Sequence, residues 1–330
     1  MSGVKCINKL TAILLSASLI LTLTGCSKKE SNVSYDLFET SYQYNISHSN
    51  TVNSSNLFSK ELCVTPNENF GLENVDYQVA SGGAVFNAST GETLYAQNIY
   101  DKLYPASTTK ILTAYVAMKH GNLDQIVTIS ENACNQASDS SVANLKPGDQ
   151  LTIRQLLYGL MLRSGNDAAI AIAEGVSGSV DAFVDLMNTE AVALGATNSH
   201  FVTPNGLHDE EHYTTVYDMY LIFRAALTYP EFLTMIQTTS YEVYYTLGDG
   251  SAASQEWANT CGYLTGKRKA PSGITVLGGK TGTTGQAKYC LVLLSLNSKN
   301  EQIISIVFHA DAATNLYLLM NEILYQYANN

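Results

Sequence analysis

The chain has 330 residues, of which 45% are hydrophobic and 14% are charged. This composition is typical of a globular protein with one large domain or two lobes, and it argues against a disordered chain. The 29 acidic residues outnumber the 18 basic ones, which gives a formal net charge of −11 at pH 7. Because nucleic-acid binding depends on basic surfaces that meet phosphates, we expect no nucleic-acid partner.

Residues 1–25 resemble the signal peptide of a bacterial lipoprotein. Lys5 and Lys9 precede an uncharged run from Leu10 to Leu23, which is shorter than the roughly 20 residues that a membrane-spanning helix needs. Leu-Thr-Gly stands immediately before Cys26, as in a lipobox. We therefore expect cleavage after residue 25 and acylation of Cys26, so that acyl chains hold the protein on the membrane.

The stretch from Cys26 to residue 75 is expected to be a lipidated cysteine followed by a flexible tether. It is rich in Ser, Asn and Tyr and has little apolar periodicity. Such a tether has an r.m.s. span of roughly 35–40 Å, enough to lift the next domain clear of the lipid headgroups. Because Ser27 and not an aspartate follows Cys26, we expect an anchor at the outer face of the bacterial cytoplasmic membrane.

Four cysteines remain once Cys6 has left with the signal peptide and Cys26 is acylated. They are Cys63, Cys134, Cys261 and Cys290. They could form two disulfides in any of three pairings. Their irregular spacing argues against a zinc site, and an apolar run around Cys290 favours buried free thiols. We expect mostly free thiols, no metal and no cofactor.

The domain expected over residues 76–330 begins and ends with strands. A hairpin is predicted for Gly83–Asn87 and Glu92–Ala96, and a helix for Thr108–Lys119 with Gly121 as its C-terminal cap. Later helices are predicted at 152–162, 167–174, 180–194, 215–227 and 313–327, and later strands at 289–296 and 302–309. This order predicts an α+β fold in which an antiparallel sheet, flanked by helices, adjoins a mainly helical lobe at about 112–235 across a cleft.

Ser107-Thr108-Thr109-Lys110 stands at the start of the first predicted helix. A spacing of three places the serine and the lysine on one helical face. A serine hydroxyl becomes a good nucleophile only when a base takes its proton, and lysine can be that base if burial or nearby positive charge lowers its pKa. By itself, however, Ser-x-x-Lys more often marks a helix cap and a surface lysine.

Two further motifs follow at predicted element boundaries. Ser164-Gly165-Asn166 offers a hydroxyl, close backbone approach, and an amide that both donates and accepts. Lys280-Thr281-Gly282-Thr283 precedes an apolar strand and supplies a cation and a hydroxyl where a peptide could lie along a strand edge. Each could be an ordinary turn, but the order of the three is the signature of the serine penicillin-recognising enzymes.

Over about residues 78–325 the chain resembles the low-molecular-mass penicillin-binding proteins, which are serine-type D-Ala-D-Ala carboxypeptidases. The similarity extends through Tyr104–Lys110, Leu162–Ala169 and Phe201–Leu207. The resemblance implies the penicillin-binding/serine β-lactamase-like fold. It also implies removal of the terminal D-Ala from peptidoglycan stem pentapeptides, and inhibition by β-lactams.

The same resemblance implies roles for individual residues. Ser107 would attack the carbonyl between the two D-alanines, Lys110 would take its proton, and Ser164 would relay a proton to the departing D-alanine. Substrate binding would fall to Asn166 for the backbone, Lys280 for positive potential, Thr281 for the terminal carboxylate, Gly282 for close approach, and Thr283, whose amide would complete an oxyanion hole with that of Ser107.

The chain also departs from the family pattern. The family often places an arginine after Lys-Thr-Gly, but here no arginine follows Arg268, and only Lys288 and Lys299 remain as lysines beyond the motif. Recognition of the carboxylate is therefore open. Many relatives carry a C-terminal β-rich domain and an anchoring helix, for which we expect the N-terminal lipid to substitute.

Three other functions fit parts of the sequence. A class A β-lactamase would carry Glu-x-x-Leu-Asn between Asn166 and Lys280, and nothing there matches it. His208 and His212 fit the His-x-x-Glu-His pattern of a zinc peptidase, but that pattern needs a helix, and the preceding Pro-Asn-Gly predicts a loop. A non-catalytic wall-binding lipoprotein remains an alternative, against which the intact Ser107 and its motifs argue.

Overall fold

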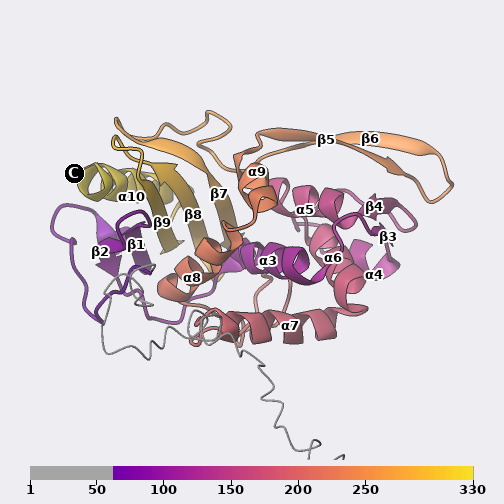
Figure 1. The fold of residues 1–330 in the computed structure, drawn as a ribbon, viewed down its shortest axis with the longest axis horizontal. Coiled ribbons are helices and arrows are strands. Elements are labelled where there is room, and N and C mark those ends of the chain that lie inside the picture. The colour runs from indigo at the N-terminus through magenta and orange to yellow at the C-terminus, as the bar shows by residue number, and fades with distance from the viewer. Residues whose placement is uncertain (1–61, 330) are drawn as a thin grey trace, which may run out of the picture. The chain divides into compact units, whose positions relative to one another are not determined.

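The computed structural model describes residues 62–329 (Figure 1). The predictions for residues 1–61 lie outside the described residues; they include the signal peptide, acylation of Cys26 and most of the tether. Among the helices of residues 62–329, none is long and apolar enough to cross a membrane.

An antiparallel sheet joins strands from the two ends of the described chain. Its order is β2-β1-β9-β8-β7, and β1 pairs with β9 from Gly82 opposite Phe308 to Asn87 opposite Ile303. The strands are β1 (Gly82–Asn87), β2 (Glu92–Gln97), β7 (Thr275–Thr284), β8 (Lys288–Leu296) and β9 (Gln302–Ala310). The prediction that terminal strands share one sheet is confirmed, as is the α+β class.

Helices cover both faces of this sheet, which explains why β8 and β9 are continuously apolar. The C-terminal helix α10 (Ala313–Ile323) packs on one face, where Leu316 and Leu319 meet Leu293 and Val307. Helix α8 (Val216–Ala226) lies against the other face (Figure 1). The predicted last helix ends as a short π-helical turn, Leu324–Ala328.

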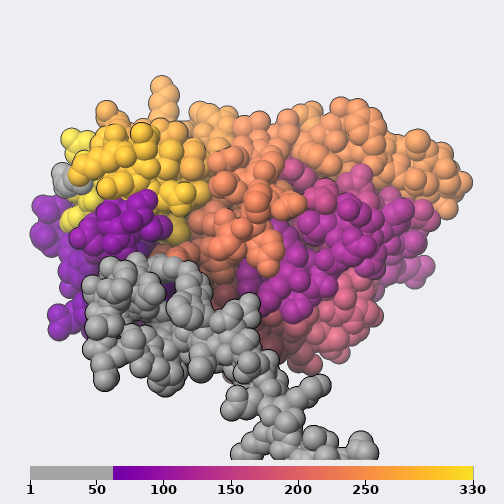
Figure 2. Space-filling model, in the orientation of Figure 1, coloured from indigo at the N-terminus to yellow at the C-terminus, as the bar shows by residue number. Residues whose placement is uncertain are grey.

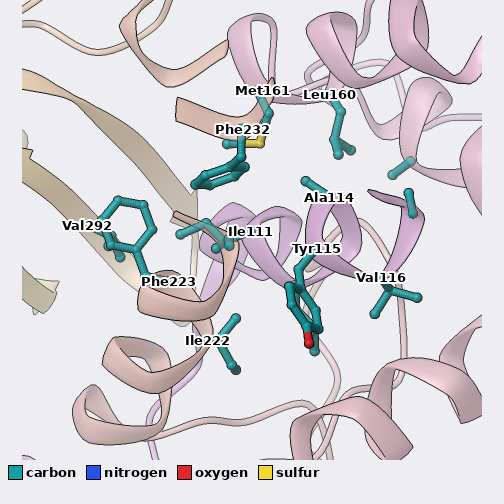
Figure 3. Packing of buried hydrophobic residues seen from close by; sticks show 14 of the residues in the cluster. Ile111, Ala114, Tyr115, Val116, Leu160, Met161, Ile222, Phe223, Phe232 and Val292 are labelled. Carbon is teal, nitrogen blue, oxygen red and sulfur yellow. The ribbon is translucent and has the colours of Figure 1, made fainter. Parts of the chain in front are cut away.

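The first helix of the domain, α3 (Lys110–His120), lies at the centre of the larger core (Figure 3). Its apolar side chains share one cluster with side chains of α5 (Ile153–Leu162), α8, α9 (Pro230–Gln237) and strand β8. The side chains labelled in Figure 3 are Ile111, Ala114, Tyr115 and Val116 of α3 together with Leu160, Met161, Ile222, Phe223, Phe232 and Val292. Because this cluster includes residues of both lobes, it fixes the N-terminus of α3 relative to each of them.

The helical lobe contains the helices predicted for it, and in addition α4 (Glu131–Cys134) and α9, which were not predicted. A capping box between Thr152 and Gln155 begins α5, and Gly178 ends α6 with φ 78°. The helices are α4 (Glu131–Cys134), α5 (Ile153–Leu162), α6 (Asn166–Ser177), α7 (Val180–Ala193) and α9 (Pro230–Gln237).

A second sheet was missed by the sequence analysis. Its order is β3-β4-β5-β6, with β3 (Ile126–Thr128), β4 (Gln150–Thr152), β5 (Ser240–Thr246) and β6 (Ala252–Ala258). The first two strands have three residues each, too short for a periodic pattern. In Figure 2 the orange part of the chain, which includes β5 and β6, extends from beside the yellow strands to the magenta helical lobe.

Residues 62–75 correct the predicted end of the tether. Cys63 is fully buried, and its amide donates to Tyr220 Oη at 3.0 Å. The backbone of Phe70 exchanges two hydrogen bonds with Ala96 of β2. This segment therefore belongs to the folded domain, and a tether that reaches residue 75 is wrong for residues 62–75. The polar composition of this segment wrongly indicated a tether, because backbone hydrogen bonds to the edge of β2, and not an apolar repeat, hold the segment in place.

All four cysteines of the described chain are free thiols, as expected. Cys63, Cys261 and Cys290 are buried, and burial raises the pKa of each thiol. Buried thiols of this kind behave as small apolar side chains.

Candidate active site

Ser107 and Lys110 meet at the N-terminus of α3. Residues Ala106–Thr109 form the 3-10 turn η5, so the α-helix begins at Lys110 and not at Thr108 as predicted. Side chains three residues apart are nearly eclipsed in a 3-10 turn. Lys110 Nζ accordingly lies 3.0 Å from Ser107 Oγ, which confirms the proximity expected from the spacing.

The ammonium group of Lys110 is enclosed by oxygen atoms. Its Nζ lies 2.8 Å from Asn166 Oδ1 and 2.6 Å from the carbonyl oxygen of Asn205, and the side chain is fully buried. Burial, reinforced by the charge of Lys280, holds the pKa of Lys110 well below its ordinary value. This lowered pKa is the property that a lysine needs in order to act as a base.

The two motifs further along the chain come together across the lobes. Lys280 Nζ of β7 lies 3.0 Å from Ser164 Oγ, which sits in the turn between α5 and α6. Ser164 has φ 58°, an uncommon left-handed backbone for a residue other than glycine. Burial lowers the pKa of Lys280 to about 7. Within residues 62–329, neither Lys280 nor Lys110 forms an ion pair with a carboxylate.

Asn166 is held in place by a residue that the sequence analysis did not single out. Asp167 is buried beside it at the start of α6, and its carboxylate accepts hydrogen bonds from the amides of Ala143 and Leu145. The Asn166 amide donates to the carbonyl of Ser141 at 2.8 Å. These bonds tie the loop before β4 to the helix whose first residue contacts Lys110, so Asp167 supports the site without touching its lysine.

The Lys-Thr-Gly motif lies inside strand β7, not before a strand as predicted. Because β7 is an edge of its sheet, a peptide could pair with its free side. Thr281 Oγ1 lies 3.1 Å from Thr260 Oγ1, a second hydroxyl that the sequence analysis missed. Gly282 faces the nucleophile turn, where a Cβ would come within 2.9 Å of the Ser107 amide nitrogen. Thr283 is exposed beside it.

The sequence identifies the segment Phe201–Leu207 only as a family match, and the structure places it in the site. Its Asn205 carbonyl contacts Lys110, and its Gly206 has φ 81°. A Cβ at Gly206 would lie 2.0 Å from the carbonyl oxygen of Ala106, so only glycine allows this close approach. Backbone contacts of this kind leave no polar side-chain signal, which is why the role of Asn205 was missed.

The zinc-peptidase alternative is not supported by the geometry. His208 and His212 lie in a loop, as predicted, and not on the helix that the motif needs. Both ring nitrogens of His212 are engaged within the protein: Nε2 with Thr109 Oγ1 at 2.8 Å, and Nδ1 with the amide of Val202 at 3.0 Å. His208 is exposed and packs edge-on against Tyr104.

Known proteins share this sequence and architecture. A family model described as D-alanyl-D-alanine carboxypeptidase matches residues 70–312. DacF, a D-alanyl-D-alanine carboxypeptidase of Bacillus subtilis strain 168, is 36% identical over 236 residues, which are 70% of this chain and 57% of DacF. A D-alanyl-D-alanine carboxypeptidase of Streptomyces strain K15 is 39% identical over 224 residues, 64% of this chain and 75% of that protein.

Solved structures agree with the sequence relatives. The crystal structure of the Streptomyces K15 DD-transpeptidase aligns with a TM-score of 0.69 at 34% identity and covers 75% of this chain and 96% of its own. The predicted penicillin-binding fold is thereby confirmed. The family match covers well over half of the residues, and the chain belongs to the D-alanyl-D-alanine carboxypeptidase family of low-molecular-mass penicillin-binding proteins.

Proposed function

We propose that the protein is a serine-type D-Ala-D-Ala carboxypeptidase that removes the terminal D-Ala of peptidoglycan stem pentapeptides. The observation that carries the proposal is the arrangement around Lys110 Nζ. A neutral amine has two N–H groups and one lone pair. Asn166 Oδ1 and the Asn205 carbonyl oxygen can only accept, so they take the two N–H groups. The lone pair is left for Ser107 Oγ, at 3.0 Å.

The first half of the reaction then follows from the contacts. Ser107 Oγ attacks the carbonyl between the two D-alanines while Lys110 takes its proton. The amides of Ser107 and Thr283 stabilise the oxyanion. The bond to the terminal D-alanine breaks, and Ser164, held by Lys280 at 3.0 Å, relays a proton to the departing amine. The product of this half is an acyl-Ser107 ester.

Substrate recognition is assigned to β7 and its neighbours. Asn166 holds the substrate backbone, and Thr281 binds the terminal carboxylate in the positive potential of Lys280. Thr260, whose hydroxyl lies 3.1 Å from that of Thr281, offers a second donor where many relatives use an arginine. Gly282 keeps the space between the strand and the nucleophile turn open.

The second half of the reaction restores the enzyme. A water molecule, activated by Lys110, attacks the acyl-Ser107 ester and releases the shortened stem peptide. A β-lactam resembles the D-Ala-D-Ala end and acylates the same serine, but its bulkier adduct obstructs the water. We therefore expect β-lactams to inhibit the enzyme by long-lived acylation.

We also propose that the protein acts at the outer face of the bacterial cytoplasmic membrane. The lipobox before Cys26 supports this location, because acylation would anchor the domain beside the wall. The test is membrane fractionation of cells that carry the wild type or Cys26→Ser. The wild type should sediment with membranes and incorporate labelled palmitate, whereas a wild type without label would refute the anchor.

The activity is tested by D-alanine release from diacetyl-Lys-D-Ala-D-Ala, with the full chain purified in detergent. Release that benzylpenicillin abolishes is expected. Ser107→Ala should show neither release nor a covalent penicillin adduct by mass spectrometry. No release from a wild type that still forms the adduct would reject the carboxypeptidase assignment.

A transpeptidase is the second candidate, because the structurally similar Streptomyces K15 protein is described as a DD-transpeptidase. The same assay with added glycyl-glycine as an amine acceptor separates the two activities. A carboxypeptidase yields mainly the hydrolysed peptide, whereas a transpeptidase yields mainly the peptide extended by the acceptor. Drug-insensitive release would contradict both.

A further inference from the structure

His212 lies directly behind the nucleophile turn and has no role in the reaction described above. It is 2% exposed, on the loop between Phe201 and α8. The amides of Val202 and Thr203 donate to its Nδ1 at 3.0 and 3.3 Å. Because Nδ1 accepts, a neutral ring must carry its proton on Nε2, which then donates to Thr109 Oγ1 at 2.8 Å. One tautomer therefore satisfies every contact.

These bonds connect two backbone segments that both contact the catalytic lysine. Thr109 is the last residue of the turn η5 and immediately precedes Lys110, the first residue of α3. On the other side, Val202 and Thr203 belong to the segment whose Asn205 carbonyl oxygen accepts from Lys110 Nζ at 2.6 Å. His212 thus bridges the turn that carries the lysine and the loop that orients its amine.

A second tie holds the same loop at another point. Thr113 Oγ1 donates to the carbonyl of Pro204 at 2.6 Å, one turn further along α3. His212 therefore holds the loop at the amides of Val202 and Thr203, and Thr113 holds it at the carbonyl of Pro204. These contacts fix the backbone immediately before Asn205.

The charge state of His212 fits the geometry. Burial lowers the pKa of His212 to about 4, so the ring is neutral when the enzyme works near pH 7. The charged and titratable groups that act on it are Asp209, His200, Lys110 and His208. An imidazolium would lose the Nδ1 acceptor and would add a positive charge beside Lys110.

We propose that His212 is a positioning residue of the acylation step. Acting through Thr109, it holds Lys110 and the Asn205 carbonyl in the relative positions in which the lone pair of the amine faces Ser107. The inference rests on the proposed function, because acylation of Ser107 is the step that it governs. His212 itself touches neither the substrate nor the reacting atoms.

Two single variants break the Nε2 contact from opposite sides. Thr109→Val keeps the shape of the side chain but removes the oxygen acceptor, and His212→Asn keeps an acceptor for the Val202 amide but cannot reach Thr109. Each should lower the acylation rate constant by benzylpenicillin about 10- to 100-fold. The dissociation constant of the complex that precedes acylation should be unchanged, because β7 is untouched.

Rescue and coupling separate positioning from mere folding. Thr109→Ser, which keeps the hydroxyl, should recover the rate to within about threefold of the wild type. The double variant should be no slower than the slower single variant, since both changes remove one bond. Thr228→Val is the control for the chemical change itself, because it removes the hydroxyl of an exposed threonine that, among the described residues, bonds only the Ala225 carbonyl of its own helix end.

The tautomer is tested without any activity. In Ser107→Ala protein with ¹⁵N-labelled histidine, the signal lost in the His212→Asn background should show a protonated Nε2 and a bare Nδ1 at pH 7. An imidazolium or the opposite tautomer there would overturn the inference.

The kinetic outcomes are equally decisive. Acylation at the wild-type rate in Thr109→Val, a change in the dissociation constant alone, or additive loss in the double variant would each overturn the positioning role. A wild type that benzylpenicillin does not acylate would instead reject the proposed function. The two failures are therefore distinguishable.

Discussion

Lys280 Nζ lies 3.0 Å from Ser164 Oγ, and this bond joins an edge strand of the main sheet to the turn between two helices of the other lobe. The lysine is 1% exposed, and no carboxylate among residues 62–329 forms an ion pair with it. A buried, unpaired ammonium group destabilises a fold. The contact between the lobes therefore costs stability in order to hold a cation at the site.

Replacing this lysine should stabilise the protein in a pH-dependent manner. Burial lowers the pKa of Lys280 from 10.5 to about 7, so between these values the unfolded chain holds a proton that the folded chain does not. The free energy of unfolding therefore rises as the pH rises from 7 to 10.5. Below pH 7 the penalty for burying the charged Lys280 is fully present. Lys280→Met should gain roughly 2–4 kcal/mol at pH 6 in urea unfolding.

The same measurement at pH 10 supplies the control. There the wild-type lysine is largely neutral when folded, so the advantage of Lys280→Met should shrink. An advantage that stays constant between pH 6 and pH 10 would show that titration of Lys280 is not its cause.

Adding a negative charge beside Lys110 should impair the base. In Asn166→Asp, a carboxylate replaces the amide oxygen that lies 2.8 Å from Lys110 Nζ. The carboxylate favours the ammonium form and raises the pKa of Lys110, so acylation by benzylpenicillin at pH 7 should fall about 100-fold. The rate should partly recover as pH rises to 9 or 10. Asn166→Ala, which adds no charge, should lose rate without that shift in the pH profile.

A methyl group at Gly282 should disturb the nucleophile. The Cβ of Gly282→Ala would lie 2.9 Å from both the Pro105 carbonyl oxygen and the Ser107 amide nitrogen. Either the strand or the turn must move, and displacement of this order should slow acylation about 100-fold. Gly285→Ala is the matched control, because its Cβ would meet nothing within 4 Å. Equal rates in the two variants would contradict the close approach of β7 to η5.

The main sheet carries a removable defect on β9, two strands from β7. Ser305 of β9 is fully buried, and its hydroxyl has no hydrogen-bond partner among the described residues. Ser305→Ala should stabilise the fold by about 0.5–1.5 kcal/mol and leave acylation unchanged. Ser254→Ala, at an exposed position of β6, should change the unfolding free energy by less than about 0.5 kcal/mol. Destabilisation by Ser305→Ala would mean that the hydroxyl is satisfied in solution.

The start of α5 and the order of the motifs could be predicted because their signals are local. The cap at Thr152 lies beside the first residue of the helix that it bounds. The end of α6 was predicted at residue 174, whereas the helix continues to Ser177 and Gly178 ends it. Ser107 and Lys110 could be paired because three residues separate them in one turn. The β5–β6 hairpin had no comparable signal, since each of its strands buries only one residue and its partner strands are very short.

The sequence by itself determined the candidate nucleophile and base, the two accompanying motifs and the α+β class, because each is encoded by residue type and spacing. Only the tertiary structure decided the surroundings of Lys110, because its burial and the Asn205 carbonyl come from segments 95 residues apart along the chain. It also decided that His212 contacts the turn of Ser107 and that residues 62–75 belong to the domain. Backbone carbonyls and desolvation leave no mark on sequence, and they arise only when distant segments pack together.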